Sequence, residues 1–570
     1  MEQKLSSIEN SLVEEISSSK NEPEWLKEYR KNSLNIYNEL PAEVSPLYGK
    51  YTDAKRMDPD KVSLSTTSNS NLPDFLSKRV EEVKKENGLI QVGTNIISTN
   101  LSDELKSKGV IVSSIDDALK QHQELIEKTI KSSNSNEDKY TALNNAAFNS
   151  GLFVYIPKNQ IIDEPIHLFS CLSDDGLSTI SRNIIIVEDN AKANLVQELY
   201  SPQNGQQQAY LELMNTSVGA NSSLDVTSLQ MMDQSSINFS TRSSHLAQDS
   251  KINWYLGLFG AMLSRYRIDY HLNGTGAVAT DSEVVFGNNE QSFDLNTIVN
   301  HNEKSTEGKV VEKSILKNKS KSLFKGMIKI NENAAHSNSF LSGRSILLDK
   351  DAKSDAIPGL EILTNDVKAT HSASVAQMDE EQLFYLGTRC LSKPEAERII
   401  VEGFLEPMSR SMSYQVRAWI AYLIESKWEG KELSINNDEQ LKALVEVEET
   451  RYNENAEIEQ HYKYRWNQMA DWITACSTDS LGQGEMFSFD HNEKKLLLTN
   501  MNGKIFATDR ICTHAEADLA NGILSETGLT CPLHLSVFKI DDGVPQNPPA
   551  EDPLQTYRTK IQDNNILIEV

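Results

Sequence analysis

The sequence has little cysteine, no long hydrophobic run and no excess of basic charge. Five cysteines in 570 residues, an odd number, argue against a secreted disulfide framework and favour a reducing cytoplasm. No apolar run approaches the ~20 residues that span a bilayer. The first residues, MEQKLSSIEN, lack the basic start and apolar stretch of a secretory signal. We therefore expect a cytoplasmic protein without a membrane segment.

Lys and Arg number 56, Asp and Glu number 82, and the net charge is −26. This acidic balance disfavours binding to nucleic acid or to an anionic membrane. The sequence also lacks a G-x-x-x-x-G-K-[ST] loop, so we do not expect the chain to bind ATP itself. A chain of this length is expected to hold roughly two to four domains.

What the sequence does contain, between about residues 182 and 378, is a repeated unit of a polar corner, a small residue and a short β-rich run. A spacing near 15 residues, taken singly, doubly or triply, accounts for most steps between units, which points to a solenoid. Runs such as NIIIV and SILL are too short for helices. We predict a parallel β-helix of about 30 residues per turn; the alternative is an ordinary β-sandwich. The aligned small residues are Ala191, Ala220, Ser250, Gly276, Ser320, Ala335, Ala352 and Val367.

Helical patterns flank this repeat. The clearest one covers about residues 23–40, where apolar side chains recur at helical spacing. After the repeat, Ser392 and Glu395 form a capping-box pattern before another apolar run. The parts we expect are a helical region at 1–145, a β-helix core at 146–380, a helical region at 381–428, a charged linker at 429–465 and a small β domain at 466–570.

Several separated segments resemble the SufB/SufD family of iron–sulfur cluster assembly proteins. They are the EPEW helix, YTALNNAAFNSGLFVYIPKNQIIDEPIHL at 140–168 and DEEQLFYLGTR at 379–389, and the resemblance covers about residues 20–425. It implies a mainly β fold with helical flanks around a right-handed parallel β-helix. It also implies a non-catalytic scaffold that pairs with a SufB-like subunit. A SufC-like ATPase, docked on the C-terminal helices, would then hydrolyse ATP.

The late part of the repeat is more similar to SufD than to SufB. The SufB branch carries a cysteine in a segment that here reads LLDKDAKSDAIPGLEI, without a thiol. The SufD branch commonly has DVKCSHGA where this chain has DVKATHSA, so Ala369 replaces the cysteine and His371 is retained. By this resemblance His371 is a candidate cluster-assembly residue, since a neutral imidazole can ligate iron. The alternative is a hydrogen-bonded corner histidine without a ligand role.

The C-terminal part contains Cys512 and His514 as C-x-H and, after sixteen residues, Cys531 and His534 as C-x-x-H. Two thiolates and two imidazoles on two matched loops suit a 2Fe–2S centre in which two histidines replace two cysteines on one iron. A Cys₂His₂ zinc site is the alternative. The block from CTH to the end of the chain resembles Rieske ferredoxins. By that resemblance the two cysteines ligate the inner iron and the two histidines the outer one.

This block departs from high-potential respiratory Rieske proteins. Their two extra cysteines, which form a disulfide, correspond here to Ala517 and Leu533. Ser536 matches a hydroxyl of those proteins, but Phe538 stands at the position of a tyrosine. We therefore expect an intermediate to low reduction potential. Leu535 replaces the usual glycine after the second histidine, which leaves the path of that loop undetermined.

Together these patterns indicate a SufD-like assembly scaffold fused to a Rieske domain that supplies single electrons during cluster assembly. A redox sensor that regulates the assembly complex, or a Rieske ferredoxin serving an oxygenase, are alternatives. A carbohydrate-active enzyme ranks last, because no corner series presents repeated Asp or Glu pairs. Cys171, Cys390 and Cys476 lack any ligand pattern and are predicted to be buried, inert thiols.

Overall fold

We describe the chain from a computed structural model. The residues it describes are 2–41, 57–132, 138–409, 412–435, 438–450, 472–491, 494–515, 517–525, 527–562 and 564–569. They form two units, Met1–Glu449 and Thr450–Val570. Most of the second half of the expected linker, residues 451–465, lies outside the described residues. None of the described helices is long and apolar enough to cross a membrane.

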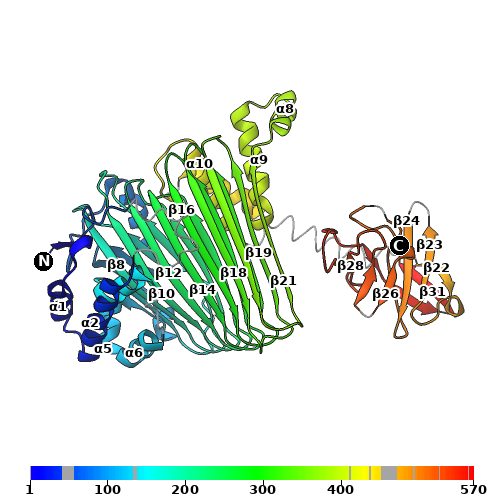
Figure 1. Cartoon of the computed structure of the whole chain (residues 1–570), viewed down its shortest axis with the longest axis horizontal. Helices are drawn as coiled ribbons and strands as arrows, with labels where there is room; N and C mark the ends of the chain where they lie inside the picture. The colour runs from blue at the N-terminus through cyan, green and yellow to red at the C-terminus, as the bar shows by residue number, and fades with distance from the viewer. Residues whose placement is uncertain are drawn as a thin grey trace. The chain divides into compact units, whose positions relative to one another are not determined.

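The first unit is a coil whose strands alternate between two parallel sheets (Figure 1). Each strand pairs in parallel with the strand one turn further along the coil. Register partners are 26 residues apart at Ile237 and Leu263, and 32 apart at Lys321 and Lys353. The predicted parallel β-helix is therefore confirmed, and the β-sandwich alternative is wrong.

One sheet contains β8 (Leu177–Val187), β10 (Ala209–Val218), β12 (Ile237–Leu246), β14 (Leu263–Leu272), β16 (Ser292–His301), β18 (Lys321–Ile330) and β20 (Lys353–Ile362). The other contains β7 (Ile166–Cys171), β9 (Lys192–Tyr200), β11 (Ser223–Gln230), β13 (Lys251–Leu258), β15 (Val278–Gly287), β17 (Glu307–Leu316), β19 (Asn338–Leu347) and β21 (Lys368–Gln377). At the start of the coil β6 (Leu152–Ile156) pairs with β8, so each turn is stacked on the one before it.

Left-handed residues turn the chain at the corners. Asn190, Asn221 and Asp249 have φ of 56°, 56° and 51°, and asparagine and aspartate tolerate this region better than most residues. The backbone amide of Asn190 donates to the carbonyl of Ala220 one turn on, at 2.8 Å. The side-chain amide of Asn221 donates to that of Asn190 at 3.3 Å, so the corners also stack on one another.

The aligned small residues prove to belong to two different corners. Ala191 and Ser250 lie before strands of the β7–β21 sheet, whereas Ser320 and Ala352 lie before strands of the β8–β20 sheet. This explains the steps of about half a turn. The alignment itself is off by two at Ala220, because the residue that follows the left-handed Asn221, and so corresponds to Ala191, is Ser222. The misalignment arises because small and polar residues both precede and follow the left-handed residue at each corner.

The N-terminal region is mainly helical, as predicted, and caps the first turn of the coil (Figure 1). Its helices are α1 (Asn10–Ser19), α2 (Glu24–Glu39), α3 (Ser77–Val83), α4 (Asp103–Ser107), α5 (Ile115–Gln121), α6 (Gln123–Ser132) and α7 (Lys139–Ala147). Short strands that the sequence did not indicate accompany them: β1 (Glu2–Lys4), β2 (Ser63–Ser65), β3 (Gly88–Val92), β4 (Asn95–Asn100) and β5 (Ile111–Ser114). β3 pairs in parallel with β7, which extends the coil's own sheet into this region.

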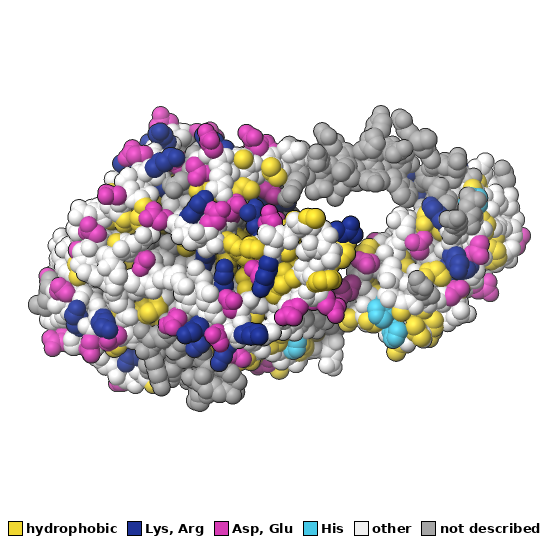
Figure 2. Space-filling view, turned by 90° about the horizontal axis from the view of Figure 1, so that it is seen from above, with side chains coloured by type: hydrophobic (Ala, Val, Ile, Leu, Met, Phe, Trp, Pro, Cys, Tyr) yellow, Lys and Arg dark blue, Asp and Glu magenta, His cyan; other side chains and the backbone are white. Residues whose placement is uncertain are grey.

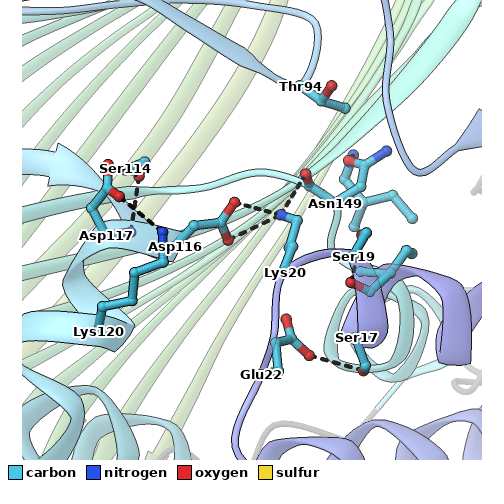
Figure 3. Close-up of polar contacts among 12 residues, drawn as sticks. Ser17, Ser19, Lys20, Glu22, Thr94, Ser114, Asp116, Asp117, Lys120 and Asn149 are labelled. Atoms are coloured by element: carbon cyan, nitrogen blue, oxygen red, sulfur yellow. Dashed lines mark hydrogen bonds and ion pairs between the residues drawn. The ribbon is translucent and has the colours of Figure 1, made fainter.

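Polar contacts fix the turn between α1 and α2 to the coil. The Lys20 ammonium donates to Asp116 of α5 at 3.0 Å and to the carbonyl of Asn149 at 2.8 Å (Figure 3). Glu22 accepts two hydrogen bonds from the guanidinium of Arg30, at 2.8 and 2.6 Å, with both side chains buried. Because a buried charge is costly without a partner, the Glu22–Arg30 pair fixes the start of α2, while the Lys20 contacts attach the turn before it to α5 and to Asn149.

The helices α8 (Glu380–Thr388), α9 (Lys393–Ser409) and α10 (Tyr414–Trp428) follow the coil, and residues 439–450 are helical as well. The fully buried ammonium of Lys427 on α10 donates to Gln291 at 2.6 Å and to the carbonyls of Phe259 and Phe286. Phe259 and Phe286 follow or end paired strands of successive turns, so α10 is attached to two turns of the coil from outside. Burial lowers the pKa of Lys427 well below its usual range.

The three cysteines outside the C-x-H and C-x-x-H motifs differ in exposure. Cys171 is buried, as predicted, and Cys476 is half-buried. The prediction for Cys390 is wrong, because this thiol is exposed. Cys390 follows the end of α8 with a φ of 65°, the left-handed turn position at which glycine is favoured. A turn residue after a surface helix stays at the surface.

Buried carboxyl groups lie inside the later turns of the coil. Asp281 accepts a hydrogen bond from the hydroxyl of Tyr270 at 2.9 Å, and Glu283 accepts one from Thr297 at 2.6 Å. Glu312 is the register partner of Glu283 one turn on. Burial raises the pKa of Asp281 to about 7 and that of Glu312 to about 8. Protonation spares the fold the much larger penalty of buried negative charge.

The second unit consists of small antiparallel sheets, as predicted. One contains β22 (Trp472–Ser477), β31 (Asn565–Glu569) and β30 (Thr559–Gln562). The next contains β23 (Met486–His491), β24 (Lys494–Met501), β25 (Lys504–Asp509) and β29 (Thr556–Tyr557). The third contains β26 (Ile523–Ser525), β27 (Gly528–Thr530) and β28 (Val537–Phe538).

The buried carboxyl group of Glu312 should make stability depend on pH. Its pKa is raised in the folded state, so folding takes up a proton between about pH 4.5 and 8, and stability falls across that window. The ideal slope for one such group is about 1.4 kcal/mol per pH unit. We expect the Tm of Glu312→Gln, relative to the original chain, to rise as the pH goes from 5 to 8. Thermal unfolding followed by circular dichroism checks this. The exposed Glu332→Gln is the control, and a Tm difference independent of pH would contradict the expectation.

Candidate metal centre

Two short loops at neighbouring positions of the second unit carry the four predicted ligands. The first follows β25, and the amide of Cys512 donates to the carbonyl of Ala517 at 2.9 Å to close it. The second joins β27 to β28, and the amide of Cys531 donates to the carbonyl of Ser536 at 2.8 Å. Each loop thus brings a cysteine and a histidine to the same end of the small β domain.

The structure brings the four side chains together as two pairs. Cys512 and Cys531 are both buried in the same core cluster of the second unit, where the two thiols influence each other's ionisation. Burial is the main cause that raises the pKa of Cys512. The rings of His514 and His534 are exposed, with their centroids 4.8 Å apart and their planes at 81°. The sulfur pair therefore lies inside and the nitrogen pair outside.

This donor set fits a 2Fe–2S cluster. Such a cluster needs two protein ligands on each iron, and in a Rieske centre one iron has two thiolates and the other two imidazoles. Within the described residues no three or more His, Cys, Asp and Glu side chains form one group around a single metal ion. We propose that Cys512 and Cys531 hold the inner iron, and that His514 and His534 hold the outer iron.

The second loop keeps the path that a glycine would give it. Leu535 has a φ of 62°, in the left-handed region, so its backbone adopts the conformation expected of the glycine it replaces. Its amide donates to the carbonyl of Cys531 at 3.1 Å, and its carbonyl accepts from the Asn547 side chain at 3.0 Å. The buried hydroxyl of Ser536 accepts from the amide of Ala550 at 3.0 Å.

The supporting residues at 547–550 were missed in the sequence. Asn547 and Ala550 lie in a third loop, and their contacts with Leu535 and Ser536 attach it to the second ligand loop. The hydroxyl of Thr513 likewise donates to the carbonyl of Asp552 at 2.7 Å. The signal available in the sequence was the turn-rich stretch QNPPAEDP, which contains no cysteine or histidine.

His371 belongs to the first unit. It lies on β21 in the last turn, where its register partner is Leu341 of β19, a residue of the buried core. Side chains at one register position of stacked parallel strands share a face. His371 thus lies on the inward face of the coil, but it is exposed because no described strand stacks on the last turn.

Comparison with known families agrees with both units. Residues 17–168 match the SufBD protein N-terminal region, and residues 170–404 match the SUF system FeS cluster assembly, SufBD core domain. The chain belongs to the SufBD family. Residues 471–558 of this SufBD protein match the Rieske [2Fe-2S] domain. The chain therefore combines the fold of an iron–sulfur assembly family with a domain that carries a 2Fe–2S cluster.

Among SufBD relatives, an iron–sulfur cluster assembly SufBD family protein of Staphylococcus aureus is 26% identical over 439 residues. The aligned part covers 74% of this chain and 93% of the relative. A SufBD family protein of Staphylococcus saprophyticus gives the same figures. Of the solved structures, a ferredoxin of Sphingomonas yanoikuyae B1 is 30% identical and covers 18% of this chain and 99% of its own, with a TM-score of 0.17. The ferredoxin of carbazole 1,9a-dioxygenase from Nocardioides aromaticivorans is 25% identical, covers 18% and 98%, and has the same TM-score.

The ligand assignment is tested by metal analysis of the full chain. We expect about two irons and two acid-labile sulfides per original chain, and near-complete loss of both in Cys531→Ser, because a hydroxyl binds iron more weakly than a thiolate. The half-buried Cys476→Ser is the matched control and should retain them. Tight binding of one zinc with no sulfide would show that the assignment is wrong.

Proposed function

We propose that this SufBD protein is a SufD-like scaffold subunit of a SUF-type assembly complex, and that its Rieske domain supplies single electrons during cluster assembly. The observation that carries the proposal is the presence of both folds in one chain. Building a cluster from iron and sulfur requires electrons as well as a scaffold. A covalent tether keeps a one-electron carrier at high effective concentration near the scaffold.

The open end of the coil supports pairing with a SufB-like subunit. Within the described residues, β20 pairs with β18 alone and β21 with β19 alone, so both last strands have a free edge (Figure 1). Exposed apolar side chains gather on these last turns: Phe340, Leu360, Ile362, Leu363 and Val375. A free edge beside apolar surface is a template for strands of another chain.

The helices after the coil support docking of a SufC-like ATPase. Phe384 and Tyr385 on α8 are 76% and 57% exposed, and Ile399 on α9 is 45% exposed. A short helix with exposed aromatic residues is poorly stabilised within its own chain and suits burial against a partner. ATP hydrolysis would then come from that partner.

The exposed histidines support the electron role. Because His514 and His534 face solvent while both cysteines are buried, the outer iron would be the one nearest to a redox partner. When bound, the cluster supplies one-electron oxidation and reduction. The four ligand residues would orient it, and the burial of Cys512 and Cys531 would keep water from their thiolate sulfurs. His371, at the open end of the coil, is proposed to face the SufB-like subunit, which would provide any further ligands.

The electron role is tested with the assembled complex of this chain, a SufB-like chain and a SufC-like ATPase under limiting reductant. We expect Cys531→Ser to slow cluster transfer at least tenfold, because the electron source is lost, while assembly of the complex is intact. Cys476→Ser is the control. Unchanged transfer rates in Cys531→Ser would remove the donor role and favour the redox-sensing alternative.

The pairing edge is tested by charge insertion. We expect Leu360→Glu and Val375→Glu to abolish co-purification with a SufB-like chain, because a charge buried in an apolar contact is strongly unfavourable. Ile161→Glu, at an exposed apolar residue in the first turn of the coil, should leave co-purification intact. Loss in all three variants, or in none, would contradict the assignment of this edge.

A further inference from the structure

Leu535 combines a strained backbone with an unburied side chain. Its φ of 62° is rare for a branched, bulky residue, whereas glycine adopts it freely. The hydrogen bonds of its amide to Cys531 and of its carbonyl to Asn547 require this turn. Its side chain is nevertheless 64% exposed, so burial within the chain does not offset the strain. Backbone strain that does not contribute to stability points to a functional role of the residue.

Leu535 is not the only exposed apolar residue beside the ligands. Leu533, on the other side of His534, is 56% exposed. Two exposed leucines thus flank one histidine ligand, and Figure 2 shows histidine side chains next to hydrophobic ones on the surface of the second unit.

Acidic residues lie on the third loop, which contacts both ligand loops. The third loop carries the exposed Glu551 and Asp552. It reaches both ligand loops, through the Asn547 contact with Leu535 and the Thr513 contact with Asp552. Residues 472–570 contain 14 Asp and Glu against 7 Lys and Arg, a net charge of 7 − 14 = −7. An apolar centre with an acidic border is complementary to an apolar patch ringed by basic residues.

We propose that Leu533 and Leu535 form the centre of a docking surface for a redox protein that presents an apolar patch ringed by lysine or arginine. In this arrangement Leu535 determines specificity: the left-handed turn holds its side chain out beside His534, where the partner buries it. The inference rests on the proposed electron role and adds the chemistry of the partner.

The probe is ferricytochrome c, a basic redox protein whose haem edge lies at its surface. The full chain is reduced with dithionite, one electron being supplied per chain, and is then mixed with the probe in a stopped-flow instrument. One electron leaves the reduced domain, and the haem iron changes from ferric to ferrous. Oxidation by hexaammineruthenium(III), which needs no apolar docking, gives the reference rate for each variant.

We expect Leu535→Gly to lower the ratio of the cytochrome c rate to the reference rate about tenfold, as loss of a central apolar contact does. The same variant should raise the Tm of the second unit by a few degrees, because glycine relieves the strain. A variant that is more stable but transfers electrons more slowly shows that the loss of rate comes from weaker docking and not from unfolding.

Glu551→Lys should lower the rate of electron transfer to cytochrome c and make that rate depend less on ionic strength. Ile561→Ala, 58% exposed on β30 outside the ligand loops, is the matched control.

Three outcomes would overturn the proposal. The first is an unchanged ratio in Leu535→Gly, whether both rates stay the same or both fall equally. The second is a fall of the ratio in Ile561→Ala as large as in Leu535→Gly, and the third is a concentration-dependent dimer in gel filtration that Leu535→Gly abolishes. The last outcome would make a second copy of the chain the occupant. If the original chain contains no iron and sulfide, the proposed function fails instead, which is a separate result.

Discussion

The parallel pairing of each turn of the coil with the next is the constraint on which the first unit depends. Every strand between β8 and β19 has a neighbour on both sides, so its backbone amides and carbonyls are satisfied by adjacent turns. The ends of the coil cannot be satisfied in this way. At the N-terminal end α1, α2 and α7, with β3 in the sheet, cover the first turn. At the other end the described residues leave β20 and β21 open, which makes that end the natural place for a partner chain.

Stacking also decides what the interior of the coil tolerates. Residues in register lie directly above one another, so a polar residue in one turn meets its register partner in the next. In the earlier turns the buried Arg242 binds Glu212 and Gln197, at 3.1 and 2.8 Å, and the charges compensate. In the later turns Glu283 and Glu312 are register partners, and burial raises both pKa values. The interior of the coil thus avoids unpaired buried charge in two ways, by ion pairing in the earlier turns and by a raised carboxyl pKa in the later turns.

The second unit depends on a different arrangement, in which short loops attached to a small β domain hold reactive groups. The thiols of Cys512 and Cys531 are inside, and the imidazoles of His514 and His534 are at the surface. Leu535 shows how closely backbone geometry and surface chemistry are linked in such a loop. Hydrogen bonds to the second ligand loop and to the third loop fix its left-handed backbone conformation. That conformation determines where its apolar side chain is exposed to solvent.

The sequence by itself determined the period of the coil, the helical flanks and the two Cys–His motifs, because each is a local pattern of residue types and spacings. It misplaced the corner alignment at Ala220, missed β3 and predicted Cys390 to be buried. Those features depend on residues distant in the chain: β3 is a strand because β7 lies beside it. The acidity of Glu312 and the exposure of Leu535 were likewise decided by the tertiary structure, since burial and solvent contact exist only once the chain is folded.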